Sequence, residues 1–270
     1  MGRNYAMKGR RRRSFLSLPP PYAWPVLALL ILLPVILVVA QLGAFLGGSP
    51  GSGGEALSAV VLDGLYDLYP NSTFIESVSK TLRDRGFSVD VFRGTNVTVD
   101  LLKKLGEYDL VILRLHSSLS ADESSLYIFS GELYSRYRYV LDQLTRTVKR
   151  AYIPGTGHPP VFALKATHLG IDSRSGLRNS IVIAMGCQSA SDETFARELL
   201  ERGARAYIGW SGPVSIQFSD TATRMVIDLM YGEGLGPCEA VEKTVGVLGP
   251  DPVYGSTLRC FVRETAPRQG

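Results

Sequence analysis

The chain has 270 residues, of which 45% are hydrophobic, and its formal net charge is +4. This length and apolar content allow one sizeable buried core, and the lack of low-complexity tracts excludes a mainly disordered chain. Six of the 29 basic residues lie within the first 13 positions, which leaves 23 basic against 25 acidic residues in the rest. Because that remainder is slightly acidic, it has no basic patch that tracks phosphates, and we expect no nucleic-acid partner.

Residues 1–23 form a basic segment, with six basic residues between Arg3 and Arg13 and no acidic residue. Residues 24–46 follow as an apolar run, and about 20 such residues span the hydrocarbon core of a bilayer as a helix. Pro34 would only kink that helix, since the neighbouring turns can still satisfy the backbone. A cleaved signal peptide is the alternative, but its apolar region is usually only about 7 to 15 residues long. We therefore predict an uncleaved transmembrane anchor.

The charges beside the apolar run predict its orientation. Basic residues next to a spanning helix stay on the cytoplasmic side, so the N-terminus is expected inside and everything after Leu46 outside the cell. Residues 47–56 are rich in glycine and serine, as in a flexible linker. The folded domain is expected from residue 57 to 265. Sequons at Asn71 and Asn96 suit an extracellular domain, although such triplets also arise by chance.

The domain alternates short apolar runs with helical patterns. The expected helices are Thr73 to Arg85, Val99 to Leu105, Glu193 to Arg202, Asp220 to Tyr231 and Cys238 to Val247. The expected strands are Ala59 to Leu62, Ser88 to Phe92, Leu110 to Leu115, Ile181 to Met185, Ala206 to Gly209 and Ser256 to Val262. This alternation predicts an α/β fold with a mostly parallel six-stranded sheet and helices on both faces.

The stretch from Ser118 to Ser180 has a weaker pattern. We expect a β-hairpin around Leu126 to Tyr134, a helix around Tyr139 to Lys149, and surface loops in the remainder.

Two expected strands end in residues with reactive side chains. His116 follows the third strand in "DLVILRLHSS", and Cys187 follows the fourth in "IVIAMGCQSA". Reactive groups of a parallel sheet collect at the carboxyl ends of its strands, so these two side chains meet if the strands are neighbours. An imidazole that takes the thiol proton produces the thiolate, which is the attacking species. The alternative is that Cys187 is apolar filler and that His116 is simply hydrogen-bonded.

The number of cysteines bears on the role of Cys187. An exported domain with three cysteines can pair two of them and leave one free. Cys238 opens one expected helix and Cys260 lies in the last expected strand, so a Cys238–Cys260 disulfide would leave Cys187 as the free thiol. The sequence leaves this pairing open.

An apolar strand ending in His, followed by an apolar strand ending in a small residue and Cys, resembles the caspase-like fold of clan CD cysteine peptidases. The segments "FARELLERGARAYIGWSGPVSIQFSD" and "DPVYGSTLRCFV" are similar to the elements that follow the cysteine in gingipain-like and CHAT-type members. The resemblance covers most of the chain from Leu57 to Val262.

The resemblance implies roles for individual residues. Cys187 matches the nucleophile and His116 the general base, while Gly186 and the Cys187 amide match the oxyanion hole. Ser117 occupies a position where the family usually has Gly, which puts the orientation of that backbone donor in doubt.

Two further residues are candidate substrate contacts. Asp220 lies where some members bind a basic substrate side chain, although capping the next helix is an equally good explanation. Trp210 is a candidate wall of the substrate pocket, with core packing as the alternative.

The sequence thus predicts a membrane-anchored, outward-facing cysteine endopeptidase that acts on a peptide or protein substrate. Neither His158 nor His168 has the spacing of a metal site, and we expect no metal and no cofactor. Two alternatives stay open: a catalytically inactive relative that binds a peptide or partner, and a surface receptor that is not a peptidase.

Overall fold

The computed structural model describes residues 57–121, 125–174 and 176–263 of the chain. The expected basic segment (1–23), transmembrane anchor (24–46) and linker (47–56) lie outside these ranges, as do residues 264–265 of the expected domain. Within the described ranges, no helix is long and apolar enough to cross a membrane.

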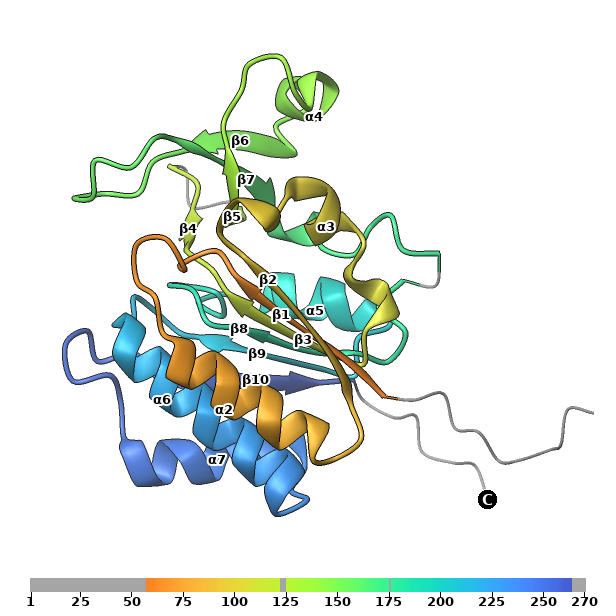
Figure 1. Ribbon diagram of the computed structural model, residues 1–270, viewed down its shortest axis with the longest axis vertical. Coiled ribbons are helices and arrows are strands. Elements are labelled where there is room, and N and C mark those ends of the chain that lie inside the picture. Colours follow the sequence, from red (N-terminus) through yellow and green to blue (C-terminus); the bar gives the residue numbers. More distant parts are fainter. Residues whose placement is uncertain (1–56, 122–124, 175, 264–270) are drawn as a thin grey trace, which may run out of the picture. The chain divides into compact units, whose positions relative to one another are not determined.

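A six-stranded sheet forms the centre of the domain (Figure 1). Its strand order is β10-β9-β8-β3-β1-β2, and every neighbouring pair is parallel except β10, which runs antiparallel to β9. The strands are β1 (Ser58–Asp63), β2 (Ser88–Arg93), β3 (Leu110–Arg114), β8 (Ile181–Ala184), β9 (Ala206–Trp210) and β10 (Leu258–Val262). All six strands lie where the sequence predicted them, with ends that differ by one or two residues.

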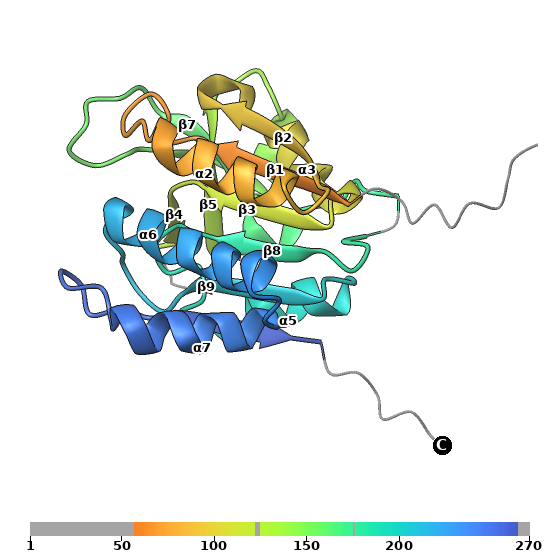
Figure 2. The ribbon, with the colours of Figure 1, turned by 60° about the horizontal axis from the view of Figure 1, so that its bottom comes forward.

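Both faces of this sheet are buried, which is why its central strands are continuously apolar rather than alternating. In β1, Val60 and Leu62 pack into one hydrophobic cluster, while Ala59 and Val61 pack into the cluster on the other side. The helices α2 (Ser72–Arg83), α6 (Ile216–Ile227) and α7 (Pro237–Leu248) cover this second side together, as Figure 2 shows. The opposite side is covered by α3 (Val99–Lys103), α5 (Glu193–Glu201) and a second sheet.

Short helical turns complete the main body. They are η1 (Gly94–Asn96), η2 (Leu105–Glu107), η3 (Ala166–His168) and the π-helical turn η4 (Asp228–Gly232), which continues α6. The α/β class and the helices on both faces of a mixed, mostly parallel sheet are therefore as predicted.

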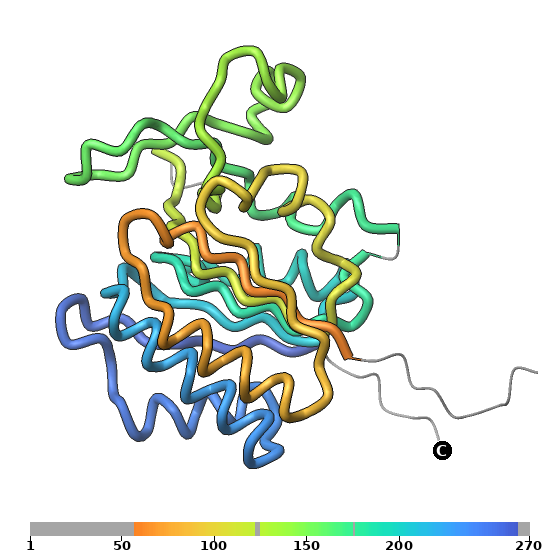
Figure 3. The backbone as a smooth tube through the Cα atoms, in the orientation of Figure 1, coloured from red at the N-terminus to blue at the C-terminus, as the bar shows by residue number. Residues whose placement is uncertain are grey.

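The second sheet has four antiparallel strands in the order β4-β5-β7-β6. Its strands are β4 (Ser117–Leu119), β5 (Leu126–Leu133), β6 (Val148–Ala151) and β7 (Val161–Lys165), and the short helix α4 (Val140–Leu144) precedes β6. In Figures 1 and 3 this sheet and α4, coloured yellow-green to green, lie above the six-stranded sheet.

The sequence predictions for this second sheet were wrong in three places. Surface loops were expected outside the hairpin and the helix, but β4 and β7 are strands of the sheet. The segment expected as a hairpin is the single long strand β5. The helix expected from Tyr139 to Lys149 is only α4, because Arg146 adopts a left-handed backbone (φ 59°) and ends the helical path, after which the chain enters β6.

A disulfide joins α7 to the edge of the large sheet. Cys238, in the first turn of α7, is bonded to Cys260 in β10, and Cys187 is the free cysteine. The bond closes a loop with a sequence separation of 22 and ties a helix to the antiparallel edge strand that it covers.

Candidate active site

The strands β3 and β8 are adjacent and parallel, as the sequence analysis required. Leu113 lies opposite Ala184, and the Met185 amide donates a hydrogen bond to the Leu113 carbonyl at 3.0 Å. His116 follows β3 and Cys187 follows β8, so both residues lie at the carboxyl edge of the sheet.

His116, Gly186 and Cys187 line the same small cavity, together with Val214 and Arg114 among others. The cavity has a volume of about 20 Å³. That is room for about one water molecule, so the site is closed to a peptide side chain in this conformation.

Gly186 is required by the close approach of the two strand ends. A Cβ atom there would lie 2.3 Å from the Ser117 hydroxyl oxygen and 2.6 Å from the Leu115 carbonyl oxygen. The Ser117 hydroxyl in turn donates a hydrogen bond to the Cys187 carbonyl at 2.6 Å. Ser117, which was singled out only for its backbone donor, thus uses its side chain to hold the cysteine loop against the histidine loop.

The His116 ring lies in an apolar and cationic environment. The rings of Tyr69 and Phe129 lie near it, with their centroids 6.1 and 6.2 Å from its own and their planes inclined to it by 78° and 57°. Its Nε2 atom is enclosed and has no hydrogen-bond partner in the described part of the chain. Burial, and then the positive charge of Arg114, lower the pKa of His116 to about 4. The imidazole is therefore neutral at neutral pH.

Cys187 is half-buried, and its thiol points to the neighbouring loop. The Sγ atom donates a hydrogen bond to the Val214 carbonyl, with 3.7 Å between the two atoms. The next residue, Gln188, adopts a left-handed backbone with φ 59°, which is uncommon for a residue with a side chain. Such strained positions cluster at functional sites, where the surrounding structure must hold them.

A buried ion cluster contributes Arg114 and Asp220 to the cavity that His116 lines. Arg114, only 1% exposed, donates from Nη1 to Asp63 at 2.7 Å and from Nε to Asp220 at 2.8 Å. Its Nη2 atom donates to Asp220 at 2.9 Å and to the Tyr69 carbonyl, also at 2.9 Å. Asp63 and Arg114 are direct partners across β1 and β3. Burial raises the pKa of Asp63 even though Arg114 opposes that shift.

The position of Asp220 differs from the sequence prediction. The expected helix start at Asp220 is wrong, because α6 begins at Ile216, so Asp220 neither caps the helix nor lies in the preceding loop. Its side chain is 5% exposed, and its carboxylate accepts hydrogen bonds from Arg114 and, at 2.8 Å, from the Asn71 amide. The charge that was expected to bind a basic substrate side chain is therefore already paired within the protein.

Trp210 is also placed differently from the predicted pocket wall. It is 1% exposed in the hydrophobic core, and its ring nitrogen donates to the Ser219 hydroxyl at 3.0 Å. That hydroxyl donates in turn to the Met185 carbonyl at 3.0 Å. Trp210 thus supports the segment leading to the cysteine from within the core, which corresponds to the alternative of core packing.

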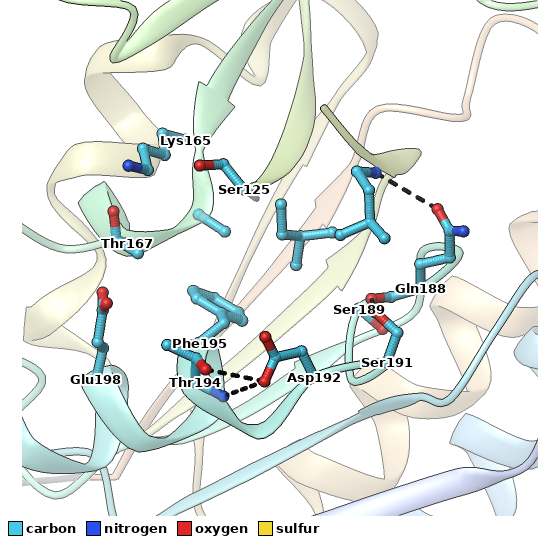
Figure 4. Close-up of a pocket in the computed structure, with 13 residues that line it drawn as sticks. Ser125, Lys165, Thr167, Gln188, Ser189, Ser191, Asp192, Thr194, Phe195 and Glu198 are labelled. Carbon is cyan, nitrogen blue, oxygen red and sulfur yellow. Dashed lines mark hydrogen bonds between the residues drawn. The ribbon is translucent and has the colours of Figure 1, made fainter. Parts of the chain in front are cut away.

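A second cavity, of about 100 Å³, lies beside the loop that follows Cys187 (Figure 4). Gln188 lines one side, and Lys165 and Glu198 lie on the other, while His116 and Cys187 take no part in it. Among the described residues there is also no cluster of three or more His, Cys, Asp or Glu side chains able to hold a metal ion.

The reasoning from sequence missed Arg114 and Asp63. A signal for them was present in the sequence. One apolar strand ends in the acidic Asp63 and another ends in the basic Arg114, and these two positions are paired across the neighbouring strands. Comparisons of the chain with protein-family models and with curated proteins found no match.

Proposed function

We propose that this chain is a membrane-anchored cysteine endopeptidase of caspase-like fold, with Cys187 as nucleophile and His116 as proton carrier. The observation that carries the proposal is that both side chains line one cavity at the carboxyl ends of adjacent parallel strands, with Nε2 of His116 unpartnered. The strand order and the antiparallel edge strand are compatible with that fold.

The resting imidazole of His116 is neutral in this proposal. Because burial and Arg114 hold the pKa of His116 at about 4, the imidazole is free to accept a proton at neutral pH. Thiol and imidazole then react by general-base catalysis, in which the proton moves as the sulfur attacks. The negative charge that develops on the substrate carbonyl oxygen offsets the unfavourable positive charge that the imidazole takes up.

The reaction follows the usual two stages of a thiol peptidase. The Cys187 sulfur forms a bond to the substrate carbonyl carbon, His116 takes the thiol proton and then gives it to the leaving amine, and the peptide bond breaks. The product is a thioester. Water then attacks its carbonyl carbon while His116 accepts the proton of the water, the carbon–sulfur bond breaks to release the acid product, and His116 returns the proton to the Cys187 sulfur. Backbone N–H groups of Gly186 and Cys187 are the expected donors to the oxyanion.

Substrate entry requires a local opening. A cavity that holds about one water molecule cannot accept a substrate residue. The Val214 carbonyl that accepts the thiol hydrogen bond lies between β9 and α6, so this connection is the segment whose displacement would free the thiol and widen the cavity.

We assign no preference for basic residues. A substrate guanidinium could bind Asp220 only by displacing Arg114 and Asn71 from a buried carboxylate. Breaking such a pair leaves an uncompensated buried charge, which is strongly unfavourable.

The cellular placement belongs to the same proposal. The apolar run of residues 24–46 anchors the chain in the cell membrane, with the basic segment inside and the domain outside. Protease added to intact cells should then digest the domain and spare residues 1–13, whereas a protected domain would overturn this orientation.

A catalytically inactive relative that binds a peptide or partner is the second candidate. It is favoured by the closed cavity and by the thiol bond to Val214 instead of to His116. A surface receptor of another kind would have no use for a free thiol and an unpartnered imidazole in one cavity.

Peptide cleavage separates these candidates. A mixed peptide library incubated with the full chain should yield defined cleavage products. The Cys187→Ala variant should yield none, and His116→Ala should be slower by about 100-fold to 10,000-fold, the usual contribution of a general base. No cleavage by the wild-type chain, with retained binding of peptides, would support the inactive relative.

A further inference from the structure

An exposed surface remains unexplained by the proposed active site. It lies on the arm, which we define as residues 133–152, the segment that runs from the end of β5 through α4 and β6. Tyr137, Leu141 and Leu144 are 74%, 78% and 75% exposed there, and Leu133 and Val140 are each 48% exposed. Large apolar side chains grouped in this way mark an interaction surface.

The helix α4 has its polarity reversed relative to an ordinary surface helix. Its polar residues face the protein: Asp142 binds Lys103 at 2.8 Å, and Gln143 accepts a hydrogen bond from the Tyr134 hydroxyl at 2.9 Å. Val140, Leu141 and Leu144 face outward, and none of the five residues of α4 is buried. A surface helix normally turns its apolar side to the core, so this one is built to meet something outside.

The arm is also the most basic part of the domain. It contains five of the 22 basic residues found between positions 57 and 263, but only one of the 23 acidic residues. Arg136, Arg146 and Arg150 are exposed and form no ion pair with any described carboxylate. Arg150 lies over the rings of Tyr134 and Tyr152, so cationic and aromatic groups occur together.

We propose that the arm binds the surface of an anionic lipid bilayer. Outward aliphatic side chains, tyrosines and arginines are the chemistry of the bilayer interface, where apolar groups enter the acyl boundary and cations meet lipid phosphates. A symmetric contact with a second copy would place the same basic surface on both sides, which like charges oppose.

The expected anchor would strengthen this contact without being needed for it. If residues 24–46 span the membrane as the sequence predicts, the bilayer surface is at a high effective concentration around the domain. An anchor of this kind leaves the orientation of the domain open. Contact through the arm would then determine the orientation, and binding that is weak in free solution becomes effective at short range.

The test is hydroxyl-radical footprinting of the full chain, with one chain per nanodisc. Discs of phosphatidylcholine alone are compared with discs of phosphatidylcholine and phosphatidylglycerol in equal parts. Labelling of Tyr137, Leu141 and Leu144 should fall several-fold in the anionic discs. Val253 and Tyr254, which are 68% and 57% exposed elsewhere, are the internal controls and should be labelled equally in both.

Reversing the charge of two arginines of the arm tests whether anionic lipid headgroups contribute to the contact. Each arginine near an anionic surface contributes about five-fold to binding, so Arg146→Glu combined with Arg150→Glu should weaken the contact at least about 25-fold and abolish the protection. Both side chains are exposed, and near-ultraviolet circular dichroism checks that the fold is retained. The proposal is overturned if the arm is labelled equally in the two kinds of disc.

Two other outcomes are also decisive. Protection that depends on protein concentration in detergent and is the same in both lipids would show that a second copy covers the arm. A chain that does not enter the nanodisc fraction would overturn the anchor instead. The arm is then tested by sedimentation with vesicles of the same two compositions, where failure to bind the anionic vesicles overturns it.

Discussion

Removing the Asp220 carboxylate should destabilise the domain, because this side chain belongs to a buried ion cluster. In Asp220→Ala, the Arg114 guanidinium loses the partner of its Nε atom and one partner of Nη2, while Asp63 and the Tyr69 carbonyl remain. The Asn71 amide, 2.8 Å from the same carboxylate, also loses its acceptor.

The cost can be worked from these contacts. Breaking a buried ion pair by removing one partner costs about 3 to 5 kcal/mol, and the remaining Asp63 places this variant near the lower end. With a urea m-value near 3 kcal/mol/M, a loss of about 3 kcal/mol lowers the unfolding midpoint by about 1 M. Asp220→Asn keeps the shape and one acceptor oxygen and should lose less.

Urea unfolding of the chain in a mild detergent, followed by near-ultraviolet circular dichroism, measures this shift. Glu233→Ala is the matched control, because its ion pair with Lys243 joins side chains that are 56% and 48% exposed. Exposed pairs contribute about 1 kcal/mol or less, so the control should unfold close to wild type. The reasoning is refuted if Asp220→Ala is as stable as the control and loses only cleavage after Arg or Lys.

Three further predictions concern the site and its surroundings. Since the pKa of His116 is lowered to about 4 from an ordinary 6.5, the unfolded chain binds its proton first as the pH falls. As the pH falls from 6.5 to 4, the free energy of unfolding of the wild type should therefore decrease by about 3 kcal/mol more than that of His116→Asn. Urea midpoints that fall by the same amount in both proteins would contradict this. Breaking the Cys238–Cys260 disulfide, whose sequence separation is 22, should lower the free energy of unfolding by about 3 kcal/mol. The urea unfolding midpoint should therefore fall when reductant is added. A Cys238→Ser/Cys260→Ser variant should show the same lower midpoint without reductant. Gly186→Ala should destabilise the domain by about 1 to 3 kcal/mol and abolish peptide cleavage, because its Cβ would lie 2.6 Å from a backbone carbonyl; a stable and active variant would show that the strand ends are further apart.

The large sheet could be predicted from sequence because its strands and helices are locally consistent. Continuous apolar runs such as 59–62 and 110–113 can only be buried on both faces, and amphipathic helices between them supply the cover. In the arm, the sequence predicted a helix that includes α4 but not which side of it faces the protein, because α4 presents Leu141 and Leu144 outward and polar residues inward. A pattern argument that places apolar side chains in the core necessarily misassigns such a helix.

The candidate site divides in the same way. The position of His116 and Cys187 follows from parallel strands sharing one carboxyl edge, and this much was accessible to sequence. The ion cluster was not, since Asp220 reaches Arg114 across 106 positions of the chain and only the packing of α6 brings them together. The family resemblance suggested a substrate contact for Asp220, and the local pattern suggested a helix cap. Neither contains any information about the distant partner Arg114.

The central claim is that Cys187 and His116 act as one catalytic unit, and covalent labelling tests it most directly. A mixture of peptidyl acyloxymethyl ketones, which need peptide binding and an activated thiol, is compared with iodoacetamide, which needs only an accessible thiol. Mass spectrometry then locates and counts the modification. We predict a peptidyl adduct on Cys187 of the wild type, none in Cys187→Ala, and at least about 100-fold slower peptidyl labelling in His116→Ala with iodoacetamide labelling retained. Peptidyl labelling of His116→Ala at the wild-type rate, or a wild-type adduct at any site other than Cys187, would contradict the claim.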